Sequence, residues 1–372
     1  MRILHISNPV SIPVKGYGGT ERIIYSLAKR QAENGHEVTV IAGKPSFIPN
    51  VKDASFMKGS PYTERKFIIK RFLTAYSMRA MLVSRSDKFD IIHNHISEEA
   101  IPLTIFSKYP VITTLHCPLT LRKIWPFITT SVASLLPRKT KFVTISKRAF
   151  KVYRPFFGND LITYIHNGID ISGIPFNPKP KKNHEIQLCF LGKLVPEKHP
   201  ILAIKIADLL YKQGYDVKLF MMGKLDFPLS KYAEKLVKMV KLRKYVTLLP
   251  NIATDKMYNI LGNCDCLIAT SFEIGLVTAQ LEALATGTPI VGLMGGSAEE
   301  VVIEGYNGYL GINLYDMASK CVSSLNIDRR NCRKIVENNF NEQRMYDNYM
   351  KIYEVVLSER LLDNQTITRK EN

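Results

Sequence analysis

The feature that most constrains the fold is a regular alternation of short apolar runs with longer segments of helical periodicity. It occurs as two series of similar length, separated by a stretch that places Pro175, Pro178 and Pro180 among lysines. Strands that alternate with helices form parallel sheets that are covered on both faces. The sequence therefore predicts an α/β fold with two sheets, each with its functional edge at the carboxyl ends of the strands.

A chain of 372 residues is long for one domain, and we expect two. The expected domains are residues 1–170 and residues 171–340. The chain is expected to be helical from about residue 329 to residue 362, and the helix at 341–362 is a candidate for packing back on the first domain. The tail at 363–372 is expected to be disordered.

Composition narrows the class of protein. With 46% hydrophobic residues the chain can bury a sizeable core. No apolar run reaches the roughly 18 residues of a membrane-spanning helix, and the start of the chain lacks the pattern of a signal peptide. The six cysteines are scattered without metal-ligand spacing. We expect them to be reduced and buried, which favours a cytoplasmic location.

The net charge of +18 indicates an anionic partner. Nucleic acid is disfavoured because no zinc finger, RNP-like strand or basic zipper is visible. An anionic membrane surface or a phosphate-bearing substrate fits at least as well. Residues 119–136, with Trp125 beside cations, are the best candidate for a membrane-surface patch. The favoured alternative for this segment is an ordinary helix packed on the sheet.

Two acids bracket a polar turn within residues 269–292. Glu273 follows an apolar run that reads as a strand, and Glu282 lies on the next helical segment. Paired acids at the carboxyl edge of a sheet, without Cys or His neighbours, suit the hydroxyl groups of a sugar or ribose better than a metal. The alternative, with equal weight on spacing alone, is that both acids are solvated.

The first expected strand, at residues 2–7, leads into a glycine turn that includes Gly18 and Gly19 and precedes a helix. Such a turn can bring the backbone close to an anion, although a plain tight turn is the likelier interpretation of glycines alone. Further strands place His93, His95 and His116 near their ends. A lone histidine after a strand is more often packed or solvated than catalytic. A second strand that places a histidine at the same edge of the sheet favours a functional role.

Lys193 and Lys198 follow another strand, five positions apart. If Lys198 opens a helix, both ammonium groups can reach one anion at a helix N-terminus. Two lysines at this spacing usually carry no function, and the pair gains weight from the acidic segment downstream.

In combination, these segments resemble the large family of retaining, nucleotide-sugar-dependent glycosyltransferases of the GT-B fold, which has two Rossmann-like domains facing across a cleft. The resemblance runs from Met1 to about Leu357. The matching segments are residues 16–21 with 35–38, 90–95, 167–170, 190–198 (FLGKLVPEK), 273–292 and 299–308 (EEVVIEGYNG).

The resemblance implies a role for each site residue. Gly18 and Gly19 would contact the donor phosphate or the acceptor, and His116 would lie beside the transferred sugar. The diphosphate would be held by Lys193 and Lys198, sugar hydroxyls by Glu273, and the ribose by Glu282. The remaining donor-binding residues would be Gly223, Gly275, Leu276 and Val277.

Three departures from the family pattern stand out. The family usually has Arg at the position of Lys193, and Lys cannot bind phosphate in the bidentate manner of Arg. It usually has Gly where this chain has His199. Its two acids are normally separated by seven residues, and here by eight, so a strict count from Glu282 falls on Ile274. We interpret the turn as carrying one extra residue, with Glu273 still directed into the site.

The implied reaction is transfer of a sugar from a nucleoside diphosphate to an acceptor hydroxyl with retention at the anomeric carbon. Lysines would stabilise the leaving diphosphate, so neither a metal nor another cofactor is expected. The acceptor is expected to be a glycan or a lipid-linked group, with the enzyme at the cytoplasmic face of a membrane in the second case. The alternatives are a nucleotide-sugar epimerase of the same architecture and a polyanion-binding protein with a decayed site.

Overall fold

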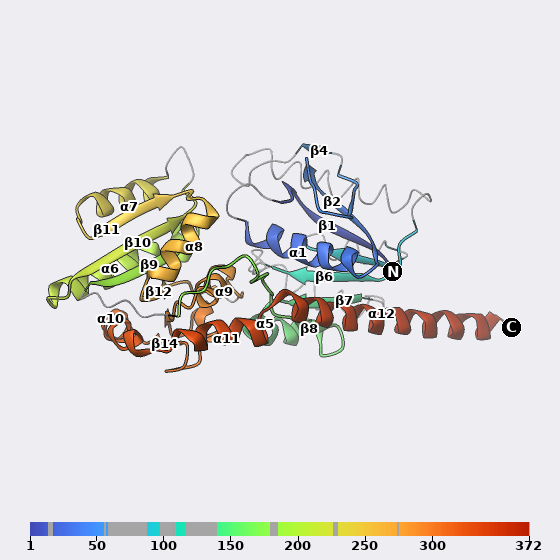
Figure 1. The fold of residues 1–372 in the computed structure, drawn as a ribbon. Coiled ribbons are helices and arrows are strands. Elements are labelled where there is room, and N and C mark those ends of the chain that lie inside the picture. Colours follow the sequence, from blue (N-terminus) through green and yellow to red (C-terminus); the bar gives the residue numbers. More distant parts are fainter. Residues whose placement is uncertain are drawn as a thin grey trace. The chain divides into compact units, whose positions relative to one another are not determined.

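The computed structural model of the chain divides into two compact units (Figure 1). The first unit comprises Met1–Gly168 together with Glu342–Asn372, and the second comprises Ile169–Asn341. The described residues are 1–13, 18–55, 57–58, 88–96, 107, 109–116, 140–178, 185–225, 230–273 and 275–371.

The first unit is built on a parallel sheet in which β1 is central. Its strand order is β3-β2-β1-β5-β6-β7-β8, with β4 also paired to β2. The central strands are almost wholly apolar or buried, as expected of a parallel sheet covered on both faces. The strands are β1 (Arg2–Ser11), β2 (Glu37–Lys44), β3 (Lys52–Asp53), β4 (Met57–Lys58), β5 (Ile91–Asn94), β6 (Val111–Leu115), β7 (Thr140–Thr144) and β8 (Ile162–Tyr164).

The described helices of this unit are α1 (Gly19–Glu33), α5 (Lys147–Phe157) and α12 (Glu342–Glu371). Asn34 ends α1 and Gly35 follows with a positive φ of 80°, as the Asn-Gly pair predicts. Ser146 caps α5 by accepting a hydrogen bond from the backbone N–H of Ala149, as its position before the helix predicts.

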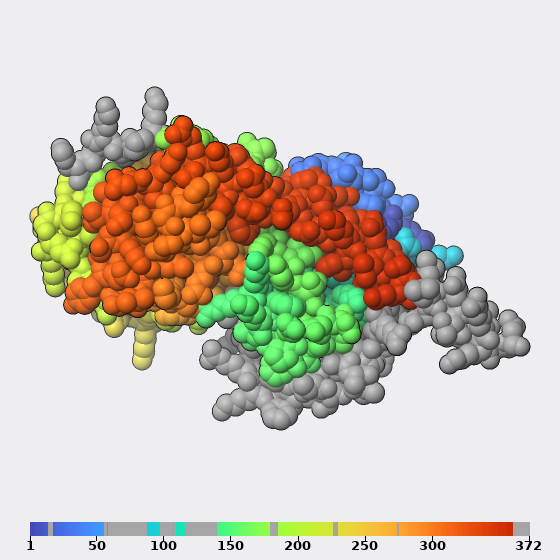
Figure 2. Space-filling model, turned by 90° about the horizontal axis from the view of Figure 1, so that it is seen from below, coloured from blue at the N-terminus to red at the C-terminus, as the bar shows by residue number. Residues whose placement is uncertain are grey.

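The C-terminal helix α12 packs on the sheet of the first unit beside α1. Figure 2 shows it (red) against the parts of this unit coloured blue and green. Polar contacts fix both ends of the packed stretch: Ser26 donates to Glu342 over 2.6 Å, and Lys141 pairs with Glu359 over 3.0 Å. The apolar core that α12 shares with the sheet and α1 consists of Ile3, Ile23, Leu27, Ile91, Ile112, Val143, Ile165, Met345, Tyr346, Tyr349, Met350, Tyr353 and Val356.

The second unit contains a parallel sheet with the order β11-β10-β9-β12-β13-β14. The strands are β9 (Ile186–Leu191), β10 (Val217–Gly223), β11 (Val246–Pro250), β12 (Cys266–Ala269), β13 (Ile290–Leu293) and β14 (Gly308–Gly311). The helices are α6 (Pro200–Lys212), α7 (Lys231–Lys241), α8 (Thr254–Asn263), α9 (Thr278–Ala285), α10 (Leu314–Ser323) and α11 (Arg329–Asn339). Three short 3₁₀ turns complete the described part: η2 (Pro196–Lys198), η3 (Ser297–Glu300) and η4 (Ser324–Asn326).

Arginines of α11 attach the start of the second unit to its core. Arg333 donates to the carbonyls of Ile171 and Ile174, and Arg329 donates to that of Asn177. Because each guanidinium satisfies several buried carbonyls at once, residues 169–178 follow the surface of the second unit. All five cysteines of the described part are buried and free, as the sequence predicts: Cys189, Cys264, Cys266, Cys321 and Cys332.

The structure differs from the sequence expectations near the end of the chain. The expected helix at 329–362 is two helices, because the chain leaves α11 at Phe340 and crosses back to the first unit, with the Phe340 carbonyl accepting from Ile169 N–H. Helix α12 then continues to Glu371, where disorder was expected from residue 363. Residues 342–371 contain no proline or glycine that would end a helix.

We predict that Val356→Ala destabilises the first unit by about 1–3 kcal/mol, because it leaves a cavity where α12 meets the sheet. Val356 is fully buried, whereas the neighbouring Val355 is 48% exposed and serves as the matched control. Hydrogen-exchange mass spectrometry over β1 and β5 measures the effect. Equal exchange in Val356→Ala and Val355→Ala would contradict the packing of α12 on this sheet.

Candidate functional site

Four neighbouring strands of the second unit end at one edge of its sheet. In the order β10-β9-β12-β13 these strands run parallel, so their carboxyl ends lie side by side. The segments that leave this edge contain Lys193 after β9, Gly223 at the end of β10, and Glu273 after β12. Most of the residues that the sequence assigns to the donor therefore gather at one edge, as expected for a parallel sheet.

Lys198 is held by the backbone of a turn that is itself anchored to the next strand. It is the last residue of η2 and is separated by His199 from α6, which starts at Pro200. The Thr270 hydroxyl, just beyond β12, donates to the carbonyls of Lys198 (2.9 Å) and His199 (3.1 Å). The position of Lys198 is thus set by a strand about seventy residues further along the chain.

His199 occupies the left-handed region, with φ 50° and ψ 44°. This conformation strains a residue that has a Cβ, and glycine adopts it without cost. The left-handed backbone conformation thus explains why the family pattern has glycine at this position. The His199 ring packs edge-on against Phe272, with the ring centroids 5.6 Å apart.

The side chains of Lys198 and Glu273 form an ion pair. They are 15% and 33% exposed, so the pair lies at the surface of the site and remains open to solvent. The structure therefore places the Glu273 carboxylate against Lys198, even with the additional residue before Glu282. Ile274, the residue reached by a strict count, lies outside the described residues.

Glu282 is buried within α9, with 3% of its surface exposed. It accepts a hydrogen bond from the Tyr258 hydroxyl of α8 over 3.3 Å. The alternative that Glu282 is a solvated helix acid is therefore wrong. A buried carboxylate is tolerated only when polar groups surround it. The burial of Glu282 therefore indicates a specific role in the site rather than a solvated position.

Gly275, Leu276 and Val277 form the entry to α9. Leu276 is buried, and Val277 is the N-cap residue, which has no side chain to accept from the first N–H groups of the helix. An uncapped helix N-terminus presents N–H donors and a partial positive charge. This end of α9 is chemically suited to an anion, and it lies one strand away from the turn that carries Lys198.

Gly223 is required by packing at the same edge. A Cβ built on it would lie 1.7 Å from the carbonyl oxygen of Gly192, which precedes Lys193. Any side chain at position 223 would displace the backbone that leads to Lys193. Lys193 itself is half-buried at the end of β9, so its orientation depends on this contact.

In the first unit, the candidate residues also lie at the carboxyl edge of the sheet. Gly18 is the N-cap of α1 and Gly19 its first residue, whereas Gly16 and Tyr17 lie outside the described residues. His116 directly follows β6. Burial lowers the pKa of His116 to about 4, so the ring is neutral near pH 7.

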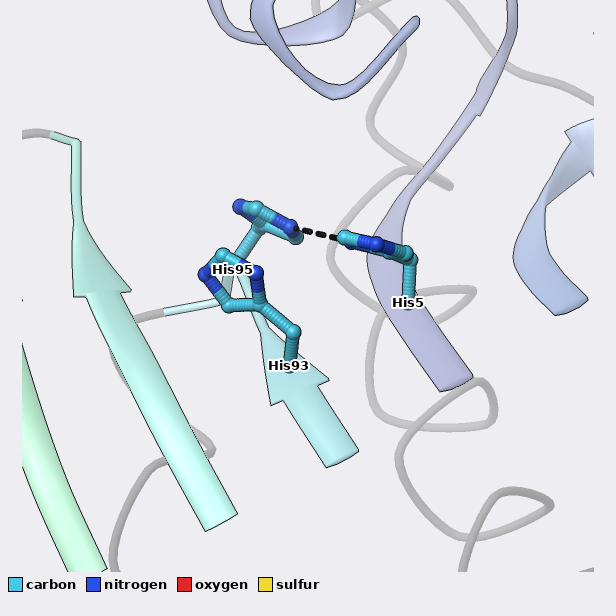
Figure 3. A group of neighbouring side chains, drawn as sticks. All are labelled: His5, His93 and His95. Carbon is cyan, nitrogen blue, oxygen red and sulfur yellow. Dashed lines mark hydrogen bonds between the residues drawn. The ribbon is translucent and has the colours of Figure 1, made fainter. Parts of the chain in front are cut away.

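His116 is part of a histidine cluster that the sequence did not reveal as a whole. His5 on β1, His93 on β5 and His95 just beyond β5 point toward one another (Figure 3). All three are buried. Sequence reasoning singled out His93, His95 and His116 but missed His5. The signal was available in the register, since His5 and His93 are directly paired on neighbouring strands.

Several predicted features fall outside the described residues. These are the candidate membrane-surface patch at 119–136 and residues 179–184 of the proline- and lysine-containing stretch between the two series. In the part of the chain that the structure describes, no helix is both long enough and apolar enough to cross a membrane.

Two family profiles match the chain. The profile described as Glycosyltransferase Family 4 matches residues 17–172, and the one described as Glycosyl transferases group 1 matches residues 175–342. Together they cover most of both units.

Individual relatives agree with the profiles. An uncharacterised glycosyltransferase of Methanocaldococcus jannaschii is 26% identical over 254 residues, which span 62% of this chain and 63% of that protein. A D-inositol 3-phosphate glycosyltransferase of Pseudarthrobacter chlorophenolicus is 24% identical over 82% of this chain and 81% of its own length. The crystal structure of Anabaena HepE with UDP and glucose superposes with a TM-score of 0.72 at 16% identity, over 95% of this chain and 100% of that one.

We predict that His199→Gly is more stable than His199→Ala by about 1 kcal/mol, because only glycine relieves the left-handed backbone at this position. Both variants lose the same ring contact with Phe272, so the comparison isolates the backbone. Urea unfolding of the two purified variants measures the difference. A more stable alanine variant, as is normal at right-handed helical positions, would contradict the observed conformation.

Proposed function

The chain is a glycosyltransferase of the GT-B fold and belongs to the Glycosyltransferase Family 4 group, and we propose that it moves a sugar from a nucleoside diphosphate to an acceptor hydroxyl with retention at the anomeric carbon. The observation that carries the proposal is the edge of the second unit. There, Lys198, the uncapped start of α9 and the buried Glu282 belong to segments that leave adjacent strands.

We assign the donor to this edge by charge. A diphosphate suits the ammonium groups of Lys193 and Lys198 together with the first N–H groups of α9. Glu282 suits the paired hydroxyls of a ribose, since a carboxylate accepts two hydrogen bonds. Gly223, Gly275, Leu276 and Val277 then shape the backbone around the nucleotide.

In this proposal, Lys198 exchanges its partner when the donor binds, leaving Glu273 for the diphosphate. A partly exposed pair contributes only about 0–1 kcal/mol, so a diphosphate with more charge can take Lys198 from Glu273 at little cost. Glu273 is then available to accept from hydroxyls of the transferred sugar. The pair thus keeps both side chains at the site in the absence of donor.

Catalysis in this proposal is electrostatic. As the bond to the anomeric carbon breaks, negative charge grows on the leaving diphosphate, and Lys193, Lys198 and the α9 N-terminus stabilise it. These groups supply the charge that a metal supplies in other sites, so the proposal needs no metal or other cofactor. The leaving phosphate itself accepts the proton of the attacking hydroxyl, on the face of the sugar that it leaves.

We further propose that the edge of the first unit, with Gly18, Gly19 and His116, receives the acceptor. The UDP and glucose bound by HepE support a UDP-sugar as the first donor to test. The acceptor class that we favour is a glycan or a lipid-linked hydroxyl. The net charge of +18 supports the proposal that the enzyme acts at an anionic membrane surface, on the cytoplasmic side of the membrane.

We predict that Lys198→Ala lowers kcat by about 10²–10³-fold, because a charge that stabilises the transition state is lost. Lys205→Ala is the matched control: Lys205 lies on the following helix α6 and is exposed. Turnover of donor with acceptor is measured for both purified variants. Equal turnover in the two would remove Lys198 from the mechanism.

We predict that one class of nucleotide sugar raises the melting temperature in a buffer that contains EDTA, because donor binding needs no divalent ion here. At 100 times its Kd a ligand stabilises the folded state by about 2.7 kcal/mol. A panel of UDP-, GDP-, ADP- and dTDP-sugars is screened. Stabilisation that appears only after adding Mg²⁺ or Mn²⁺ would contradict the role given to the lysines, and turnover of the donor without acceptor into an epimer would contradict transfer.

A further inference from the structure

The histidines of the first unit form a buried hydrogen-bonded chain that the proposed chemistry does not explain. His116 Nε2 lies 2.9 Å from His95 Nδ1, and His95 Nε2 lies 3.0 Å from His5 Nδ1. The chain ends at α1, where His5 Nε2 lies 2.7 Å from the side-chain oxygen of Gln31. Residues from β1, β5, β6 and α1 are thereby connected to the candidate sugar-binding His116.

A second branch starts at the other end of the Gln31 amide. Its nitrogen donates to the hydroxyl of Tyr353 on α12, over 3.2 Å. The Tyr353 hydroxyl lies 2.7 Å from His93 Nδ1, and His93 Nε2 lies 2.7 Å from Thr114 Oγ1. Gln31 thus joins both branches, and its amide has one acceptor and one donor end.

The direction of every hydrogen bond in the first branch follows from Gln31. The amide oxygen can only accept, so His5 must carry its proton on Nε2, which leaves Nδ1 as an acceptor. His95 must then donate from Nε2 to His5, and its own Nδ1 accepts from His116. In neutral rings this fixes His116 with its proton on Nε2 and a lone pair on Nδ1.

Rotating the amide of Gln31 by half a turn would reverse the whole series. Its nitrogen would donate to His5, each ring would donate from Nδ1, and His116 would carry its proton on Nδ1. The observed orientation of the amide selects the first direction, because its oxygen faces His5 and its nitrogen donates to Tyr353. The tautomer of His116 is therefore set three hydrogen bonds away, at Gln31 on helix α1.

A metal ion is the other candidate for His5, His93 and His95, whose ring nitrogens lie within 4.8 Å of one another. All six ring nitrogens of these three residues already have hydrogen-bond partners in the network. A bound ion would have to break several of these bonds in a site closed to solvent. The geometry favours the hydrogen-bonded chain.

We propose that Gln31 is a positioning residue which, through His5 and His95, holds His116 as the neutral Nε2–H tautomer, so that Nδ1 accepts a hydrogen bond from a hydroxyl of the sugar substrate. The last clause rests on the proposed function, whereas the tautomer does not. His116 is in this account an acceptor that orients the sugar, with no part in moving protons.

Two observations indicate that His116 acts as a hydrogen-bond acceptor rather than as a base. Burial lowers the pKa of His5 and of His116 to about 4, and holds the pKa values of His93 and His95 well below the usual range. In addition, the chain ends at an amide, which cannot pass a proton on. A proton taken up at Nδ1 would place a positive charge next to the buried rings of His5, His93 and His95, which is costly without a counter-charge.

The test is long-range ¹H–¹⁵N NMR of the full chain with ring-labelled histidine, assigned by single His→Gln variants. In the wild-type protein we expect His116, His95 and His5 all to show the Nε2–H tautomer near pH 7. The Nδ1–H tautomer at His116 would overturn the proposal. So would one equivalent of Zn²⁺ that removes the ring protons of His5 and His95 in the same spectra.

Variants of Gln31 then test its control of the chain. Gln31→Met, which matches the side chain in size but makes no hydrogen bond, should give a mixture of tautomers at His116. Gln31→Glu keeps an acceptor toward His5 and should restore the Nε2–H tautomer. Thr114→Val is the matched control, because it cuts only the second branch and should leave His116 unchanged. A pure Nε2–H tautomer in folded Gln31→Met would contradict the control by Gln31.

Turnover separates this proposal from the proposed function. We expect Gln31→Met to lower kcat/KM about tenfold, the effect of losing one ordinary hydrogen bond to the sugar, and Gln31→Glu to recover most of it. If the wild-type chain transfers no sugar, the proposed function fails while the tautomer result stands. If Gln31→Met mixes the tautomers without changing transfer, the role of His116 toward the sugar is wrong.

Discussion

The second unit depends on one constraint: adjacent parallel strands must end at the same edge, and their connecting segments must then pack without side chains in the way. Gly223 and Gly192 touch through backbone, and Gly296 allows the segment after β13 to lie against the carbonyl of Ser271. The Ser297 N–H donates to that carbonyl, and Thr270 donates to two carbonyls before α6. These backbone contacts place a cation, a helix N-terminus and a buried acid within one group of segments.

The first unit meets a different requirement, because its sheet needs a cover that the chain supplies last. Helix α12 returns after the second unit and brings Tyr349 and Tyr353 onto the face that carries the histidines. The bond between Tyr353 and His93 joins residues 260 positions apart. A buried polar cluster of this kind is stable only when each member has a partner, so the edge with His116 depends on the last helix.

Local patterns allowed much of the fold to be predicted. Strand β9 at residues 186–191 and helix α6 at residues 200–212 have strong periodicity and clear end signals, so the local pattern is enough to place them. The break at Phe340 was not predictable in this way, since it results from the chain crossing between units. The segment with Glu299 and Glu300 forms the 3₁₀ turn η3, which is too short for regular α-helical bonding.

In the candidate site, too, some features were predictable from local patterns and others depended on tertiary packing. The resemblance assigned Lys198 and Glu273 to the same donor, and the structure pairs their side chains despite one additional residue in the turn. The burial of Glu282 could not be read from spacing, because every residue of α9 is buried and the helix therefore lacks a polar face. His5 and Gln31 were not predicted as site residues, because the strand pattern of β1 and the helix pattern of α1 already account for their positions. Only the register of β1 with β5 and the packing of α1 bring them to His95.

The most direct measurement of the central claim is a crystal structure of the chain with its nucleotide-sugar donor or the corresponding nucleoside diphosphate. The account predicts diphosphate oxygens within hydrogen-bond distance of Lys198 Nζ and of the first N–H groups of α9, with the ribose on Glu282 and with Glu273 released from Lys198. A nucleotide bound elsewhere, or bound with the Lys198–Glu273 pair intact and Glu282 untouched, would contradict it.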